Sequence, residues 1–227
     1  MNLKQYLLKF ISHSNFLQFL ASNLILSLPN FLSHNLSKYN LISNIFYTLN
    51  MDNIIGDYNE FGCFTGSSIK HAKRSYEKLF EDKKKKMNFY GFDSFEGFPE
   101  EIHDHYKNKN FIVDYDHIKK IGKKYNIEFI KGFFDKSLTS EEIKNKISRI
   151  SFCFIDCDLG VSAKPVFDFV KKRLINGAFI MIDDYYNLDK NGNSIMKEFL
   201  KNFEINQNVF VYKRFGISGV CYRFFKQ

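Results

Sequence analysis

Short apolar runs alternate with segments of helical periodicity from residue 56 to about residue 203. Apolar runs bounded by glycine or polar residues predict buried strands, and the periodic segments between them predict amphipathic helices. The strands are expected at residues 57–61, 87–92, 127–131, 150–155 and 178–182, and the helices at 67–80, 118–125, 140–147, 163–174 and 194–203. Ser140 is expected to cap the helix at 140–147. This alternation predicts an α/β fold with a doubly wound, mostly parallel sheet.

Both ends of the chain depart from this alternation. Residues 209–215 and 220–225 flank a Gly-Ile-Ser-Gly turn and predict an antiparallel hairpin at the edge of a Rossmann-like sheet. Residues 1–50 carry Leu, Ile and Phe at helical spacing, and Pro29 separates two helical pieces. We expect extra N-terminal helices at 1–50, as a lid or dimer contact, before a domain at 51–227, with a polar inserted loop at 99–116.

The N-terminal helices suit three roles. They could pack on the sheet or on a second subunit in a homodimer, cover the active site, or associate with a membrane surface. The apolar stretch at residues 16–32 is broken by polar residues and by Pro29, so it is too short to span a bilayer. No small-residue cleavage site follows it, and we expect no membrane span.

Composition indicates a globular protein rather than a disordered one. The chain has 227 residues, 44% of them hydrophobic, and a formal net charge of +8. No aromatic-basic repeat accompanies the lysines, which argues against a nucleic-acid partner, whereas a basic surface suits an anionic ligand. The four cysteines contain no Cys-x-x-Cys pair, which predicts reduced thiols in a cytoplasmic protein.

Four aspartates follow the last two strands of the expected parallel sheet. Asp156 and Asp158 follow one strand, and Asp183 and Asp184 follow the next. Ligands of such sheets bind beyond the carboxyl ends of the strands, and residues two apart leave the same face of an extended segment. Carboxylates this close would raise one another's pKa unless a cation joined them. The pattern therefore predicts a site for a hard cation such as Mg²⁺.

A glycine turn and a further aspartate predict a second half of the site. The turn, EFGCFTGSS at residues 60–68, runs from a strand into a helix, where glycines allow close approach and free N–H groups await an anion. It matches neither Gly-x-Gly-x-x-Gly nor the P-loop, which disfavours both of those readings. Asp93, at the end of the second strand, is placed to accept hydrogen bonds from ribose hydroxyls.

Each motif also has a purely structural explanation. The glycine turn suits a plain strand-to-helix connection, and Asp93 suits a turn or a helix cap. The four acids could cap loops or form ion pairs with Lys164 or Lys172.

Five pieces of the chain together resemble the class I S-adenosylmethionine-dependent methyltransferases, and specifically the macrocin O-methyltransferase (TylF/MycF) family. They are GDYNEFGCFTGSS, YGFDSFEGFPE, IKGFFDKSL, ISFCFIDCDL and NGAFIMIDDYY, and they cover residues from about 56 to 200. The resemblance implies S-adenosylmethionine as cofactor, Mg²⁺ or another divalent cation, and a sugar hydroxyl as acceptor. Gly160 stands where the family commonly has Tyr, and residues 1–50 match only loosely.

The resemblance also implies a role for each matching residue. Asp158 would be the general base, and Asp156, Asp183 and Asp184 the metal ligands. The cofactor-binding residues would be Glu60, Phe61, Gly62, Thr65, Gly66, Ser67, Asp93, Ser94, Gly132, Phe133 and Asp156.

Four other functions compete with this one. A catechol-type O-methyltransferase shares the fold and the use of a metal ion to bind the acceptor hydroxyl. A cofactor-binding protein of the same fold could also lack catalysis. A nicotinamide-dependent dehydrogenase also uses an acid after the second strand. A nucleic-acid methyltransferase is disfavoured, because Asp183-Asp184-Tyr185-Tyr186 is not of the Asn/Asp-Pro-Pro-Tyr type.

Overall fold

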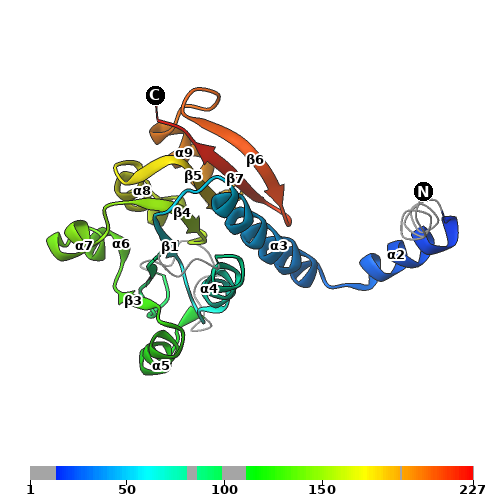
Figure 1. Ribbon diagram of the computed structural model, residues 1–227, viewed down its shortest axis with the longest axis horizontal. Helices are drawn as coiled ribbons and strands as arrows, with labels where there is room; N and C mark the ends of the chain where they lie inside the picture. The colour runs from blue at the N-terminus through cyan, green and yellow to red at the C-terminus, as the bar shows by residue number, and fades with distance from the viewer. Residues whose placement is uncertain (1–13, 81–85, 99–110, 190, 227) are drawn as a thin grey trace.

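One seven-stranded sheet organises the computed structural model, which describes residues 14–80, 86–98, 111–189 and 191–226 (Figure 1). The strands are β1 (Asp57–Phe61), β2 (Phe89–Asp93), β3 (Glu128–Lys131), β4 (Ile150–Ile155), β5 (Leu174–Ile182), β6 (Val209–Phe215) and β7 (Gly219–Phe224). Their order is β3-β2-β1-β4-β5-β7-β6; the first five run parallel, and β7 pairs antiparallel with both β5 and β6. This confirms the predicted fold, including its C-terminal hairpin.

Helices cover both faces of the sheet, because the central strands send apolar side chains to each face. The helices are α2 (Asn15–Ser27), α3 (Asn30–Met51), α4 (Ser67–Leu79), α5 (Tyr115–Tyr125), α6 (Phe134–Ser137), α7 (Glu141–Lys146), α8 (Gly160–Lys171) and α9 (Ile195–Asn202). The second half of α3, with α4 and α5, packs on one face. Helices α7, α8 and α9 pack on the other. All four cysteines are free and buried.

The structure corrects three of the predicted element details. Helix α8 ends at Lys171, because Leu174 is buried and pairs with Ile150 at the start of β5. Ser140 takes the position before α7, but its side chain makes no cap hydrogen bond within the described residues. The short helix α6 was not predicted, and most of the loop expected at 99–116 lies outside the described residues.

Helix α3 begins outside the core and ends inside it. Its later residues Leu41, Ile42, Ile45, Phe46 and Leu49 are buried. Phe46 lies among aromatic rings of α4 and three strands; its ring centroid is 5.5 Å from that of Phe152. The second half of α3 is therefore part of the sheet's own hydrophobic core.

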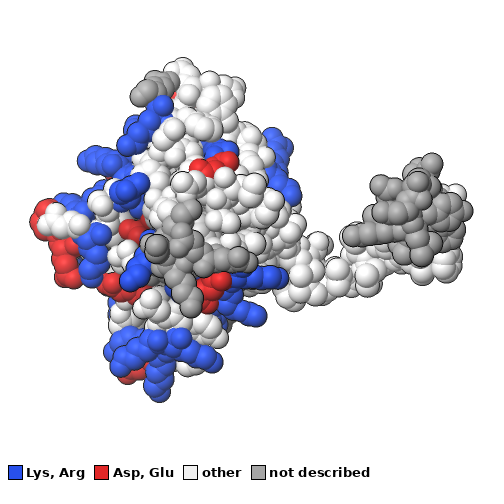
Figure 2. Space-filling view, viewed as in Figure 1, with Lys and Arg blue, Asp and Glu red and all other residues white. Residues whose placement is uncertain are grey.

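Helix α2 has no buried residue and projects away from the body of the molecule (Figure 1). This arm carries no Lys, Arg, Asp or Glu, whereas the body displays many of them (Figure 2). Within the described residues, no single helix is long and apolar enough to cross a membrane. Only α2 and α3 counted together, with a bend of 109° between them, meet that criterion by length and composition.

Phe46→Ala should destabilise the protein by about 3–5 kcal/mol, because it empties a fully buried aromatic site. Phe31→Ala is a matched control on the same helix, where the side chain is 67% exposed; it should change stability by less than about 0.5 kcal/mol. Urea denaturation measures both variants. Equal losses would contradict the burial of the second half of α3.

Candidate active site

A cavity of about 550 Å³ opens beyond the carboxyl ends of β1, β2 and β4. It is lined by Gly62, Phe64, Asp93, Ser94, Gly97, Phe98, Phe111, Phe133, Phe134, Asp135, Asp156, Cys157, Asp158, Val161, Ser162 and Pro165. The cavity brings together residues of the predicted cofactor site and of the acidic site. Phe133 was the one aromatic lining residue predicted; the other aromatic and aliphatic lining side chains come from loops and helix ends distant in sequence.

The loop after β1 lies directly against the end of β4. A Cβ at Gly62 would lie 1.8 Å from the Asp156 carbonyl oxygen, and Gly62 has a φ of +92°, so only glycine fits. Gly66 then precedes α4 with a φ of +70°. In the described structure no side chain caps this helix, so its first backbone N–H groups remain available to an anionic ligand.

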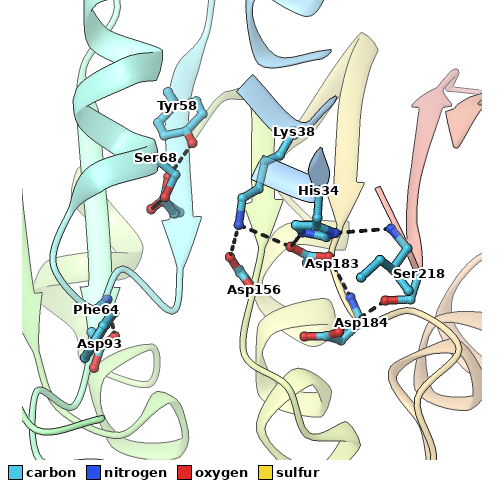
Figure 3. A network of polar contacts seen from close by, with 12 residues as sticks. His34, Lys38, Tyr58, Phe64, Ser68, Asp93, Asp156, Asp183, Asp184 and Ser218 are labelled. Carbon is cyan, nitrogen blue, oxygen red and sulfur yellow. Dashed lines mark hydrogen bonds and ion pairs between the residues drawn. The ribbon is translucent and has the colours of Figure 1, made fainter. Parts of the chain in front are cut away.

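Asp93 is held in place at the end of β2 by the loop after β1. Its Oδ2 accepts a hydrogen bond from the Phe64 N–H at 2.8 Å (Figure 3), and its Oδ1 accepts one from the Phe95 N–H at 2.7 Å. Burial raises the pKa of this carboxyl, and the backbone donors oppose that shift. Each oxygen has a second lone pair, so the carboxylate can also accept from a diol in the cavity.

Glu60 and Phe61 are not among the cavity-lining residues. The Glu60 carboxylate is fully buried and accepts hydrogen bonds from the Tyr58 hydroxyl at 2.5 Å and the Ser68 hydroxyl at 2.7 Å (Figure 3). Burial raises its pKa to about 7. Phe61 stacks on Phe92 in the core, with ring centroids 5.0 Å apart. Both residues support the glycine turn from beneath.

The other predicted cofactor residues divide between the cavity and its surroundings. Ser94 and Phe133 line the cavity. Thr65 and Ser67 are exposed on the glycine turn beside it. Gly132 lies one residue before Phe133, with a φ of +142°.

Asp156 and Asp183 converge, as predicted, but on a lysine. The Nζ atom of Lys38, from α3, lies 3.3 Å from Oδ2 of each aspartate (Figure 3). Burial opposes the charge of the ammonium, yet the two carboxylates outweigh burial and raise the pKa of Lys38. Burial and the charge of Asp183 raise the pKa of Asp156, while Lys38 opposes the shift. An internal cation thus joins the two strand ends.

His34 lies one helical turn before Lys38 and also contacts Asp183. Its Nε2 lies 3.0 Å from the Asp183 Oδ2, and its Nδ1 accepts the Ile217 N–H at 3.2 Å. Because Nδ1 is an acceptor, Nε2 carries the proton and donates to the carboxylate. Burial would raise the pKa of Asp183, but the His34 hydrogen bond and the Lys38 charge outweigh it and lower that pKa.

Asp158 and Asp184 form a second pair, apart from Lys38. Asp158 has a φ of +58°, so the chain leaves the predicted extended conformation there, although Asp156 and Asp158 still line the same cavity. Burial, and then the nearby charges of Asp156 and Asp184, raise the pKa of Asp158 well above its usual range. A side-chain hydrogen bond with Asp184 raises the pKa of Asp158 further. Asp184 also accepts from Asn187 at 2.7 Å.

The acids do not meet in the arrangement predicted for a metal. Within the described parts of the chain, no three His, Cys, Asp or Glu side chains form a group that could hold a metal ion. The structural alternative, in which the acids form ion pairs, holds for Asp156 and Asp183, but their partner is Lys38 and not Lys164 or Lys172. Lys38 and His34 escaped prediction, although Lys38 is the sole Lys, Arg, Asp or Glu between residues 10 and 51.

The family model described as Macrocin-O-methyltransferase (TylF) matches residues 37–223. Among solved structures, the O-methyltransferase NovP matches with a TM-score of 0.64 and 18% identity, over 84% of this chain and 80% of that chain. The calicheamicin methyltransferase CalS11 matches with a TM-score of 0.70 and 15% sequence identity, over 96% of this chain and 90% of that chain. An O-methyltransferase from Bacillus cereus, in complex with SAH, matches with a TM-score of 0.53 and 15% sequence identity, over 92% of this chain and 89% of that chain. None of the curated proteins matches the chain.

Glu60→Gln should make stability less dependent on pH. The pKa of Glu60 rises from 4.5 to about 7 on folding, so the folded protein binds the extra proton between these values. Stability therefore falls as the pH rises from 4.5 through 7, and the variant should lack up to about 3 kcal/mol of that fall. Denaturation at pH 5, 6, 7 and 8 measures it, with the exposed Glu204→Gln as control. Parallel curves for wild type and Glu60→Gln would contradict the burial effect.

Proposed function

The chain belongs to the macrocin-O-methyltransferase (TylF) family, and we propose that it transfers a methyl group from S-adenosylmethionine to a hydroxyl of a sugar-containing acceptor. The observation that carries the proposal is the single cavity lined by both Asp93 and Asp158. One residue suits a ribose diol, and the other suits a reacting hydroxyl. Donor and acceptor would therefore meet in the same space.

The cofactor half of the cavity fits S-adenosylmethionine by its donor and acceptor groups. The uncapped start of α4 suits the carboxylate of the methionine moiety, with Thr65 and Ser67 beside it. Asp93 suits the ribose hydroxyls, and Phe133 and Phe134 supply apolar walls for the adenine. The part of the cavity at β1, β2 and α4 therefore offers a suitable group for each moiety of the cofactor.

The acid half of the cavity suits a hydroxyl that must lose its proton. Bound S-adenosylmethionine supplies an electrophilic methyl group, whose carbon–sulfur bond breaks as the carbon–oxygen bond forms. Asp158 lies at the cavity wall and, when ionised, accepts the hydroxyl proton. Its raised pKa makes it a stronger base than an exposed aspartate. Asp184 orients Asp158 through the hydrogen bond between them.

A sugar acceptor is supported by the family and by the properties of this chain. CalS11 is described in one of its structures as a TDP-rhamnose 3'-O-methyltransferase. The formal net charge of +8 suits an acceptor that bears phosphate, such as a nucleotide sugar or a glycan precursor.

Magnesium dependence is the finer expectation that the family resemblance adds. The carboxylates have the right chemistry for a hard cation, but their arrangement does not fit one. Lys38 occupies the position between Asp156 and Asp183, and Asp184 accepts hydrogen bonds from Asn187 and Ser218. The proposed mechanism therefore contains no step through a metal ion.

Asp158→Asn should lower kcat by about 10²–10⁴-fold while cofactor binding is retained, because the amide cannot accept the proton. A methyl-transfer assay with a panel of nucleotide sugars measures kcat, and calorimetry with S-adenosylhomocysteine measures binding. Asp168→Asn, exposed on α8, is the matched control and should behave as wild type. Undiminished turnover in Asp158→Asn would remove this residue from the mechanism.

S-adenosylhomocysteine should bind to the wild-type protein, and NAD should not. The turn at Gly62 brings the backbone against β4 without the second glycine of a dinucleotide-binding loop. Calorimetric titration with each compound gives the comparison. NAD binding of equal or greater affinity would favour a dehydrogenase and refute the proposed methyl donor.

A further inference from the structure

The ammonium of Lys38 is a built-in part of the acidic site. Its side chain is 12% exposed, and those of Asp156 and Asp183 are 22% and 4% exposed. The Nζ atom also lies 5.6 Å from the centroid of the Phe154 ring, which adds a cation–π contact. A surface lysine would lose little by leaving such partners, but this one would leave Asp156 without its ion-pair partner and Asp183 with His34 alone.

We propose that Lys38 is the resident cation of this site and neutralises Asp156 and Asp183 in place of a divalent metal ion. A metal ion bound by both Oδ2 atoms would need the space that Nζ holds 3.3 Å from each of them. Two cations cannot share that position, because their repulsion is strong at such a separation and is weakly screened in a buried site. Metal binding would therefore require Lys38 to leave.

Helix α3 is fastened so that Lys38 stays in place. One turn earlier, His34 donates to Asp183 and accepts from the Ile217 N–H. The adjacent Ser37 hydroxyl accepts from the Gly216 N–H at 3.1 Å. One turn later the helix enters the core, where Leu41 and Ile42 are buried. Contacts on both sides of Lys38 thus fix the helix above the strand ends.

The inference deepens the proposed function and relies on it only for the activity measurement. Metal binding and thermal stability are measured without methyl transfer, so the two ideas fail separately. If metal binding behaves as expected but no acceptor is methylated, then the proposed function is wrong and the role of Lys38 stands.

The test compares wild type with Lys38→Met, which keeps most of the length of the side chain and removes the ammonium group with its charge. Mn²⁺ binding is followed by the electron paramagnetic resonance signal of the free ion. Lys38→Met should bind one Mn²⁺ at least tenfold more tightly than wild type, and Lys38→Met/Asp183→Asn should lose the gain. Lys78→Met, exposed on α4, is the control and should match wild type.

Thermal unfolding supplies an independent measurement. Lys38→Met should melt at a lower temperature than wild type, and Mg²⁺ should restore part of the loss in the variant while leaving wild type unchanged. After exhaustive chelation, wild type should keep its methyl-transfer activity. If Lys38→Met does not fold, as judged by its far-ultraviolet circular dichroism spectrum, Lys38→Gln replaces it.

Three outcomes would overturn the proposal, two of them measured on wild type. Stoichiometric Mn²⁺ binding by wild type that is as tight as in the variant and is lost in Asp183→Asn would show that the metal displaces Lys38. Loss of wild-type activity on chelation, with recovery on adding Mg²⁺, would lead to the same conclusion. A gain in Lys38→Met that survives Asp183→Asn would place the new metal elsewhere and would also refute it.

Discussion

Carboxylates at the ends of neighbouring buried strands need a positive charge, and in this protein a helix from the N-terminal segment supplies it. Asp156 and Asp183 directly follow β4 and β5, whose parallel pairing places both residues at the same edge of the sheet. Lys38 satisfies both. This ion pair ties helix α3 to the strands that carry the acids, so the site is not a property of the sheet alone.

The carboxyl-end edge of the sheet has two parts: one presents ligand-recognition groups and the other presents the acids. The strands β1 and β2 present the glycine turn and Asp93, which recognise a ligand through backbone N–H groups and one carboxylate. The strands β4 and β5 present the acids. One cavity spans Gly62, Asp93, Asp156 and Asp158, so its position follows from the strand order β2-β1-β4-β5.

Local patterns predicted much of this fold, because apolar runs and glycine turns reflect local chemistry. Strand β1 was predicted at its observed bounds, and so was β4. The patterns did not predict that Leu174 starts β5, since its partner Ile150 is distant in sequence. They also missed Lys38, whose two acidic partners lie more than a hundred residues away. The left-handed conformation at Asp158 was missed as well. Aspartate adopts this conformation more readily than most residues, but it does so too rarely to serve as a sequence signal.

The contact between Gly62 and the Asp156 carbonyl has a consequence for how the cavity can diversify. Because no side chain separates them, the cofactor loop and the end of β4 touch through backbone alone. Any larger residue there would push the two strand ends apart and lengthen the path between donor and acceptor. Neighbouring wall positions such as Phe64 and Val161 carry exposed side chains, so they can change size without moving either strand. Substitutions at these wall positions can therefore reshape the cavity while the contact between Gly62 and the end of β4 is kept.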